Sequence, residues 1–152
     1  MPKMAARPSN ILSGEHRHTL DEKNRLIVPL ALRARGAREL IVVQHPDAYL
    51  AVFTPQQFDK FHQSLVEKNM EPEERRRFIF MMNHVARPAA MDAQGRMSLS
   101  QIEIEHMGAG REVVFTRGSE VSLFEIWNPV RHGAAVQDQR DRFRQTLVKG
   151  GV

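Results

Sequence analysis

The sequence contains no cysteine, which excludes disulfide bonds and thiolate metal sites and fits a cytosolic setting. No apolar run approaches the roughly 20 residues that a membrane-spanning helix needs. The N-terminal segment has no long apolar core followed by a small-residue cleavage site, so we expect no secretion. Phosphate-binding loops, glycine-rich nucleotide fingerprints and nucleophile elbows are also missing. The sequence therefore predicts neither an enzyme nor a cofactor.

The composition is that of a globular protein, with 41% apolar and 26% charged residues among 152. The net charge is +4, but it is unevenly distributed. Residues 1–38 hold eight basic and three acidic side chains, whereas residues 87–117 hold four of each. A basic surface favours an anionic partner such as nucleic acid, although an ordinary solvated surface could carry the same charge.

A twelve-residue motif occurs twice. It reads HTLDEKNRLIVP at His18–Pro29 and AAMDAQGRMSLS at Ala89–Ser100. In each copy an apolar residue precedes an aspartate, an arginine follows four positions later, and alternating apolar residues come next. The copies lie 71 positions apart, and the matched pairs are Asp21 with Arg25 and Asp92 with Arg96.

Each motif is expected to form a tight turn between two strands. The residue before the arginine is Asn24 in the first copy and Gly95 in the second, and both residue types tolerate a positive φ. Repetition of strands, turn and helix along the chain indicates a duplicated α+β fold. A four-stranded unit of this size cannot bury both faces alone, so we expect the two halves to intertwine.

Apolar spacing, proline and glycine place the remaining elements. The expected strands are residues 15–20, 25–28, 40–43, 49–53, 112–116 and 121–127. The expected helices are residues 29–35, 55–71, 72–85, 101–107 and a last helix from Pro129. The second of these has a capping box from Thr54, and the third carries an apolar stripe of Phe78, Met81, Met82 and Val85, interpreted as core packing. The last helix has few apolar contacts, so it either docks on a neighbouring subunit or frays.

Four segments resemble the MraZ family of bacterial transcriptional regulators: GEHRHTLDEKNRLIVP, EPEERRRF, MDAQGRMSLS and FEIW. The resemblance runs from about residue 12 to residue 139. It implies an α+β fold of duplicated AbrB-like swapped-hairpin β-barrel halves, related by a pseudo-two-fold axis and flanked by helices. The implied boundaries are a flexible tail at 1–10, repeat 1 at 11–57, connecting helices at 58–84, repeat 2 at 85–129, and a C-terminal helix and tail at 130–152.

The resemblance also implies a function. Proteins of this family form homo-oligomeric closed rings and bind double-stranded DNA at directly repeated promoter boxes. They repress their own operon and the division and cell-wall gene cluster, so a cytoplasmic, nucleoid-associated location is expected. The alternative is a ring-forming scaffold that acts through protein contacts.

The resemblance places the DNA-binding surface on the two Asp-x-x-x-Arg hairpins. Arginine suits this role because its planar guanidinium can bond a phosphate or the O6 and N7 atoms of guanine through two donors. The expected DNA-binding residues are Arg25, Lys23, Arg96, Arg17, His18 and Asn24, with His16 extending the basic strip. The expected structural turn residues are Asp21, Asp92 and Gly95. The first hairpin, with more basic neighbours, is the expected dominant tip.

Other interpretations of these residues are possible. Each arginine could instead form an internal salt bridge that holds its turn. Two equivalent aspartates are also typical of an acid–base dyad, but an adjacent arginine would keep both ionised. His16 and His18 could bind a metal, but no third ligand is evident, and solvent exposure is the expectation for both.

Overall fold

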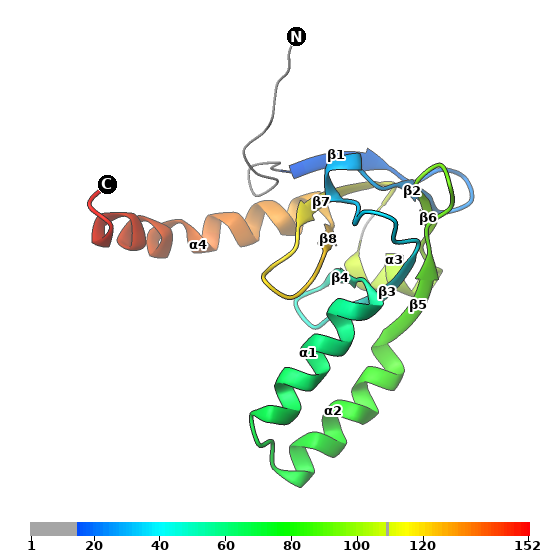
Figure 1. Ribbon diagram of the computed structural model, residues 1–152. Helices are drawn as coiled ribbons and strands as arrows, with labels where there is room; N and C mark the ends of the chain where they lie inside the picture. The colour runs from blue at the N-terminus through cyan, green and yellow to red at the C-terminus, as the bar shows by residue number, and fades with distance from the viewer. Residues whose placement is uncertain (1–14, 109) are drawn as a thin grey trace.

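A computed structural model describes residues 15–108 and 110–152, so the predicted tail at 1–10 and the start of the predicted first repeat lie outside the described residues (Figure 1). The strands are β1 Glu15–Thr19, β2 Arg25–Ile27, β3 Glu39–His45, β4 Tyr49–Phe53, β5 Ala86–Ala90, β6 Arg96–Ser98, β7 Glu112–Arg117 and β8 Phe124–Trp127. The α-helices are α1 Pro55–Glu67, α2 Pro72–Val85, α3 Gln101–Met107 and α4 Pro129–Lys149, and a 3-10 turn occupies Leu30–Leu32. None of the described helices is long and apolar enough to cross a membrane.

The protein is α+β, and its paired strands are antiparallel. Six strands form one sheet in the order β1-β7-β8-β4-β3-β5, and β2 pairs with β6 in a separate two-stranded ribbon. Each outer strand pairs with a strand from the other half of the sequence, because β1 joins β7 and β5 joins β3. Strands at equivalent places in the two halves, 71 to 73 positions apart, are β1 and β5, β3 and β7, and β4 and β8. Each such pair lies at equal distances from the two edges of the sheet, so the sheet is symmetric about its centre.

The main core lies between the six-stranded sheet and the ribbon. Leu26 and Met97 face each other across β2 and β6, and each is 1% exposed. Alternate residues of the central strands point toward them, as a period of two requires. Burial of each such side chain contributes about 1.5–3 kcal/mol. The largest fully buried apolar members are Phe115, Phe124, Leu26, Leu32, Leu50, Met97, Met107 and Ile126.

The opposite face of the sheet is covered by helices. α1 starts at the predicted capping box, in which the Thr54 hydroxyl accepts from the Gln57 backbone N–H at 3.1 Å. α1 and α2 form a hairpin that projects from the sheet, and its sheet-side end packs against Val43, Ala51 and Phe53 (Figure 1). The predicted α2 stripe is confirmed in part: Met82 packs here, but Met81 is 47% exposed, so its assignment to the core was wrong.

α4 is capped by Asn128, whose side-chain oxygen accepts from the Val130 backbone N–H at 2.8 Å. The start of the helix lies on β7, and the rest extends away from the sheet (Figure 1). Phe143 is 61% exposed and Leu147 38%, which agrees with the expectation of few apolar contacts.

The two short helices after the ribbon strands differ, and the first was predicted too long. α3 forms as expected, because Ser100 and Glu103 make a capping box and Gly108 ends the helix with a φ of 67°. The equivalent residues in the first half, Pro29 and Leu32, can supply neither the hydroxyl nor the carboxylate. That segment therefore forms only the 3-10 turn, which the fully buried Leu32 holds against the core.

Candidate nucleic-acid interface

The outer face of the β2–β6 ribbon carries both motif arginines. Arg25 pairs with Ser98 across the ribbon, and Arg96 pairs with Ile27. Leu26 and Met97 turn inward, so the arginines, being one position away along each strand, turn outward. They are diagonal neighbours, which in an antiparallel pair are about 7–8 Å apart. The two motifs thus contribute to one surface.

The first tip is held by Asp21. Its Oδ1 accepts from the backbone N–H groups of Lys23 and Arg25, both at 2.8 Å. Its Oδ2 accepts from Arg25 Nε at 2.7 Å. Asn24 has a φ of 58°, and its N–H donates to the Asp21 carbonyl at 3.0 Å. These donors stabilise the ionised carboxylate and lower the pKa of Asp21, the Arg25 backbone N–H being the largest cause.

The second tip repeats this geometry. Asp92 Oδ1 accepts from the backbone N–H groups of Gln94 and Arg96, both at 2.9 Å, and Oδ2 accepts from Arg96 Nε at 2.8 Å. Gly95 has a φ of 86°. The backbone N–H of Arg96, followed by its side chain, lowers the pKa of Asp92 to about 2. Both aspartates are therefore ionised at neutral pH, and neither is set up as a general acid.

Each aspartate fixes the orientation of its arginine and leaves part of the guanidinium available for other contacts. Within residues 15–108 and 110–152, Arg25 and Arg96 engage their aspartates through Nε alone, which leaves both terminal NH2 groups open to a ligand. The two side chains are 32% and 34% exposed. The internal salt bridge and the ligand-binding role, posed as alternatives by the sequence, are thus compatible in one geometry.

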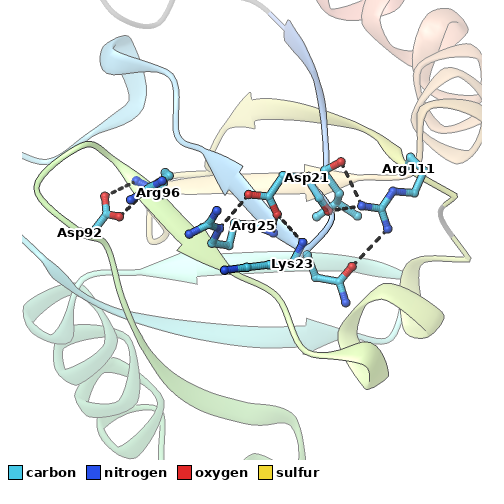
Figure 2. Close-up of polar contacts among 8 residues, drawn as sticks. Asp21, Lys23, Arg25, Asp92, Arg96 and Arg111 are labelled. Atoms are coloured by element: carbon cyan, nitrogen blue, oxygen red, sulfur yellow. Dashed lines mark hydrogen bonds and ion pairs between the residues drawn. The ribbon is translucent and has the colours of Figure 1, made fainter.

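The two ends of this surface differ in charge. Lys23 is exposed and lies beside Arg25 (Figure 2). The equivalent position in the second tip is Gln94, which carries no charge. Lys23, Arg25 and Arg96 follow one another across the surface (Figure 2). This arrangement can bind an anion at several points, most strongly at the first tip.

The expected basic strip along β1 is not continuous. His16 and His18 alternate with Arg17, so Arg17 lies on the opposite face of the strand. The expectation that both histidines are solvent-exposed was wrong: both are half-buried, and His18 makes an edge contact with Phe115 at 5.4 Å. Burial, and secondarily His16, lowers the pKa of His18, so at neutral pH it adds no charge to the surface. The described residues contain no cluster of side chains that could hold a metal.

Two arginines that the sequence did not single out contact the tips. Arg111 immediately precedes β7. Its guanidinium donates to the Leu20 carbonyl at 3.1 Å, to the Asp21 carbonyl, and to Asn24 Oδ1 at 3.2 Å (Figure 2). Arg33 donates through Nε to the Val28 carbonyl at 2.9 Å, and its guanidinium covers Gly95. The repeat does not pair these two arginines with each other: at an offset of 73 residues Arg111 corresponds to Arg38, and at 71 residues Arg33 corresponds to Ile104.

An ion pair between Arg87 and the buried Glu103 supports the strands of the second hairpin. Glu103 is 1% exposed, and its two carboxylate oxygens accept from Arg87 Nε and Nη2, both at 2.8 Å. Arg87 Nη2 also donates to the Ser98 carbonyl at 3.0 Å, which joins β5 to β6. Glu103 raises the pKa of Arg87 through these hydrogen bonds. This pair is structural, since Glu103 is closed to any ligand.

The fold and this surface define a class of protein: an α+β protein that presents fixed arginines on an exposed two-stranded ribbon, as suits a polyanion. A family model described as "MraZ protein, putative antitoxin-like" matches residues 11–80. The chain is 30% identical to the "Transcriptional regulator MraZ" of Pelodictyon phaeoclathratiforme, over 86% of this chain and 91% of that protein. It is also 30% identical to the protein of the same name from Oenococcus oeni, over 76% and 79%.

The chain belongs to the MraZ family of transcriptional regulators. A relative from Paenarthrobacter aurescens with the same name is 27% identical over 88% of this chain and 92% of that protein. The alignments with these relatives extend over both halves of the chain, as the sequence resemblance predicted. A transcriptional regulator is not a class of enzyme.

Proposed function

We propose that this protein is a sequence-specific DNA-binding repressor that reads the major groove with the outer face of the β2–β6 ribbon. The observation that carries the proposal is the pair of arginines on that face, each oriented by an aspartate and each with its terminal NH2 groups open. A two-stranded ribbon fits the major groove, where arginine can bond O6 and N7 of guanine through two donors. Each such pair contributes about 1–3 kcal/mol of discrimination against a wrong base.

The first tip is proposed to dominate binding. Lys23 adds a sequence-independent contact to a DNA phosphate beside Arg25, and the side-chain amide of Asn24 can donate to the same DNA backbone. Gln94 gives the second tip no equivalent charge. Arg17 and His18, proposed from the sequence as further DNA contacts, are weaker candidates. They lie on opposite faces of β1, so they cannot form one continuous strip, and the lowered pKa of His18 leaves it uncharged at neutral pH.

The fold is proposed to be a pair of AbrB-like swapped-hairpin halves with a pseudo-two-fold axis, with repeat boundaries at 11–57 and 85–129. The palindromic strand order and the pairing of β1 with β7 and of β5 with β3 support this. The helices at 58–84 and 130–152 then flank the two repeats, and residues 1–10 precede them.

A closed homo-oligomeric ring is proposed to present many such ribbons to directly repeated promoter boxes. Linked weak contacts gain effective concentration, so the array can bind more tightly than one ribbon. The regulated DNA is proposed to lie upstream of the protein's own operon, with the division and cell-wall genes, which places the protein on the cytoplasmic nucleoid. The exposed apolar residues of α4, Phe143 and Leu147 among them, are candidates for subunit contacts.

The test is a binding titration of Arg25→Ala against the DNA upstream of the protein's own gene, over a salt series. Loss of a bidentate contact predicts roughly 10- to 100-fold weaker specific binding. Arg96→Ala should weaken binding less, and Lys23→Ala should reduce the slope of log K against log salt by about one. Arg77→Ala, an exposed arginine on α2, is the matched control and should bind normally.

A ring-forming scaffold is the second candidate, favoured by the exposed apolar residues of α4 and of the α1–α2 hairpin. A DNA-binding protein should lose affinity with a slope of about −0.9 for each neutralised phosphate. If the wild-type protein shows no specific binding, or if Arg25→Ala binds like Arg77→Ala, the DNA-binding proposal fails and the scaffold is preferred.

A further inference from the structure

Each recognition tip receives an arginine from the opposite half of the chain. The first tip, in the N-terminal half, is contacted by Arg111 of the C-terminal half. The second tip, in the C-terminal half, is covered by Arg33 of the N-terminal half. The two contacts differ in chemistry, although the turns that they support are nearly identical.

Arg111 is placed to fix the first turn at three points. Its terminal nitrogens donate to the carbonyls of Leu20 and Asp21, at the start of the turn, and to the side-chain oxygen of Asn24, at its end (Figure 2). The Leu20 backbone N–H also donates to the Arg111 carbonyl at 2.8 Å, so the turn is joined to residue 111 through both backbone and side chain. Asn24 has a positive φ that most residues avoid, and the hydrogen bond from Arg111 to its side chain favours that conformation.

Arg33 acts on the second turn by contact. A Cβ at residue 95 would overlap the Arg33 guanidinium, and Gly95 is buried beneath it. Asn24 is less buried than Gly95, so a side chain fits at position 24, whereas a side chain at 95 would meet the Arg33 guanidinium. The overlapping atoms are the end of a flexible side chain, so a larger residue would displace Arg33 before it disturbed the backbone.

We propose that Arg111 is a positioning residue for DNA recognition: it fixes the first tip from the opposite half, so that Lys23 and Arg25 are presented in one geometry. The inference rests on the proposed function, because it specifies how the DNA-reading tip is held. Arg111 bonds backbone carbonyls and an amide, which lysine cannot reach together, since lysine offers a single ammonium in place of a planar fork. The role therefore depends on shape as well as charge.

The test uses the full-length variants Arg111→Ala and Arg111→Lys with Arg77→Ala as the control, and it has two readouts. The first is independent of DNA: hydrogen exchange of the Asn24 and Arg25 amides, together with the rate of tryptic cleavage after Lys23. Loss of the Arg111 guanidinium should accelerate amide exchange and cleavage roughly tenfold or more in both Arg111 variants. Both rates should be unchanged in Arg77→Ala.

The second readout is DNA binding over a salt series. Both Arg111 variants should lose roughly 10- to 100-fold in specific affinity while the salt slope of Arg111→Lys stays at the wild-type value. A direct phosphate contact predicts the reverse: lysine restores binding, alanine lowers the slope by about one, and the turn amides exchange as before. That pattern, or normal exchange in both variants, overturns the positioning role.

The two proposals can fail separately. If wild-type protein does not bind DNA, the proposed function is refuted, and the exchange and cleavage rates alone decide whether Arg111 fixes the tip. If Arg25→Ala loses binding while both Arg111 variants bind and exchange normally, the DNA-binding function stands and the positioning role is refuted. Size-exclusion chromatography and circular dichroism of each variant show whether it is folded in its usual assembly.

Discussion

The ion pair between Arg87 and Glu103 predicts that removing the base is more damaging than neutralising the acid. The glutamate side chain is 2% exposed, whereas the arginine side chain is 37% exposed. In Arg87→Ala, the described contacts leave the buried carboxylate only the Ser100 backbone N–H, at 2.9 Å. An uncompensated buried charge costs about 3–5 kcal/mol of unfolding free energy.

Glu103→Gln should cost less. The amide oxygen can still accept from Ser100, and the partly exposed guanidinium of Arg87 can recover hydrogen bonds from water. The change replaces charge-assisted hydrogen bonds with neutral ones, a loss of about 1–2 kcal/mol. For a chain of this length, that corresponds to about 2–8 °C in Tm, against about 6–20 °C for Arg87→Ala.

The assay is urea unfolding at fixed protein concentration, followed by circular dichroism, for both single variants and the double variant. Because Glu103→Gln removes the orphaned charge, the double variant should be more stable than Arg87→Ala alone. A double variant that is less stable than Arg87→Ala would refute the reasoning, as would a larger loss from Glu103→Gln than from Arg87→Ala. Arg77→Ala, exposed on α2, should unfold like the wild type.

The folded-state pKa of His18 lies below its ordinary value of 6.5. The stability that its neutral, half-buried imidazole contributes is therefore complete above pH 6.5 and is lost as pH falls from 6.5 toward the lower folded-state pKa. His18→Gln should flatten the dependence of the urea midpoint on pH between 7.5 and 5.5, and an unchanged dependence would contradict this. Ser100→Ala should cost about 1 kcal/mol, because it removes the oxygen that caps α3, as measured by urea unfolding. If α4 holds the proposed assembly together, ending the chain after Pro129 should give a smaller species on size-exclusion chromatography and leave Tm nearly unchanged. An unchanged elution volume would exclude α4 from the proposed subunit contacts.

Local signals in the sequence were enough to predict much of this structure. The Thr54 and Gln57 pattern predicted the start of α1, and the expected strand at 49–53 coincides with β4. The repeat predicted two turns. What it could not supply was contact between distant segments: the Arg111 bonds to Asn24 span 87 positions, and no short-range pattern encodes them.

The errors have two different causes, one local and one tertiary. A 3-10 turn replaced the expected helix at 29–35 because a proline occupies the position where Ser100 caps α3. His16 was expected in solvent, yet its Nε2 is buried with no hydrogen-bond partner among the described residues. It occupies the position of Arg87, and Leu32 occupies that of Glu103, so the first half cannot form the equivalent ion pair.

The two tips also differ at equivalent positions, which bears on the proposed reading of DNA. A strictly two-fold reading surface presents the same groups in both directions and suits a palindromic site. Here Lys23 and Gln94 occupy equivalent places, Asn24 is bonded by an arginine, and Gly95 is covered by one. Because one end of the surface is chemically different from the other, a ribbon that binds DNA as proposed would distinguish the two directions of a duplex. A set of boxes that all run the same way would then orient every bound subunit alike, which agrees with the directly repeated boxes of the proposed function and disfavours inverted ones.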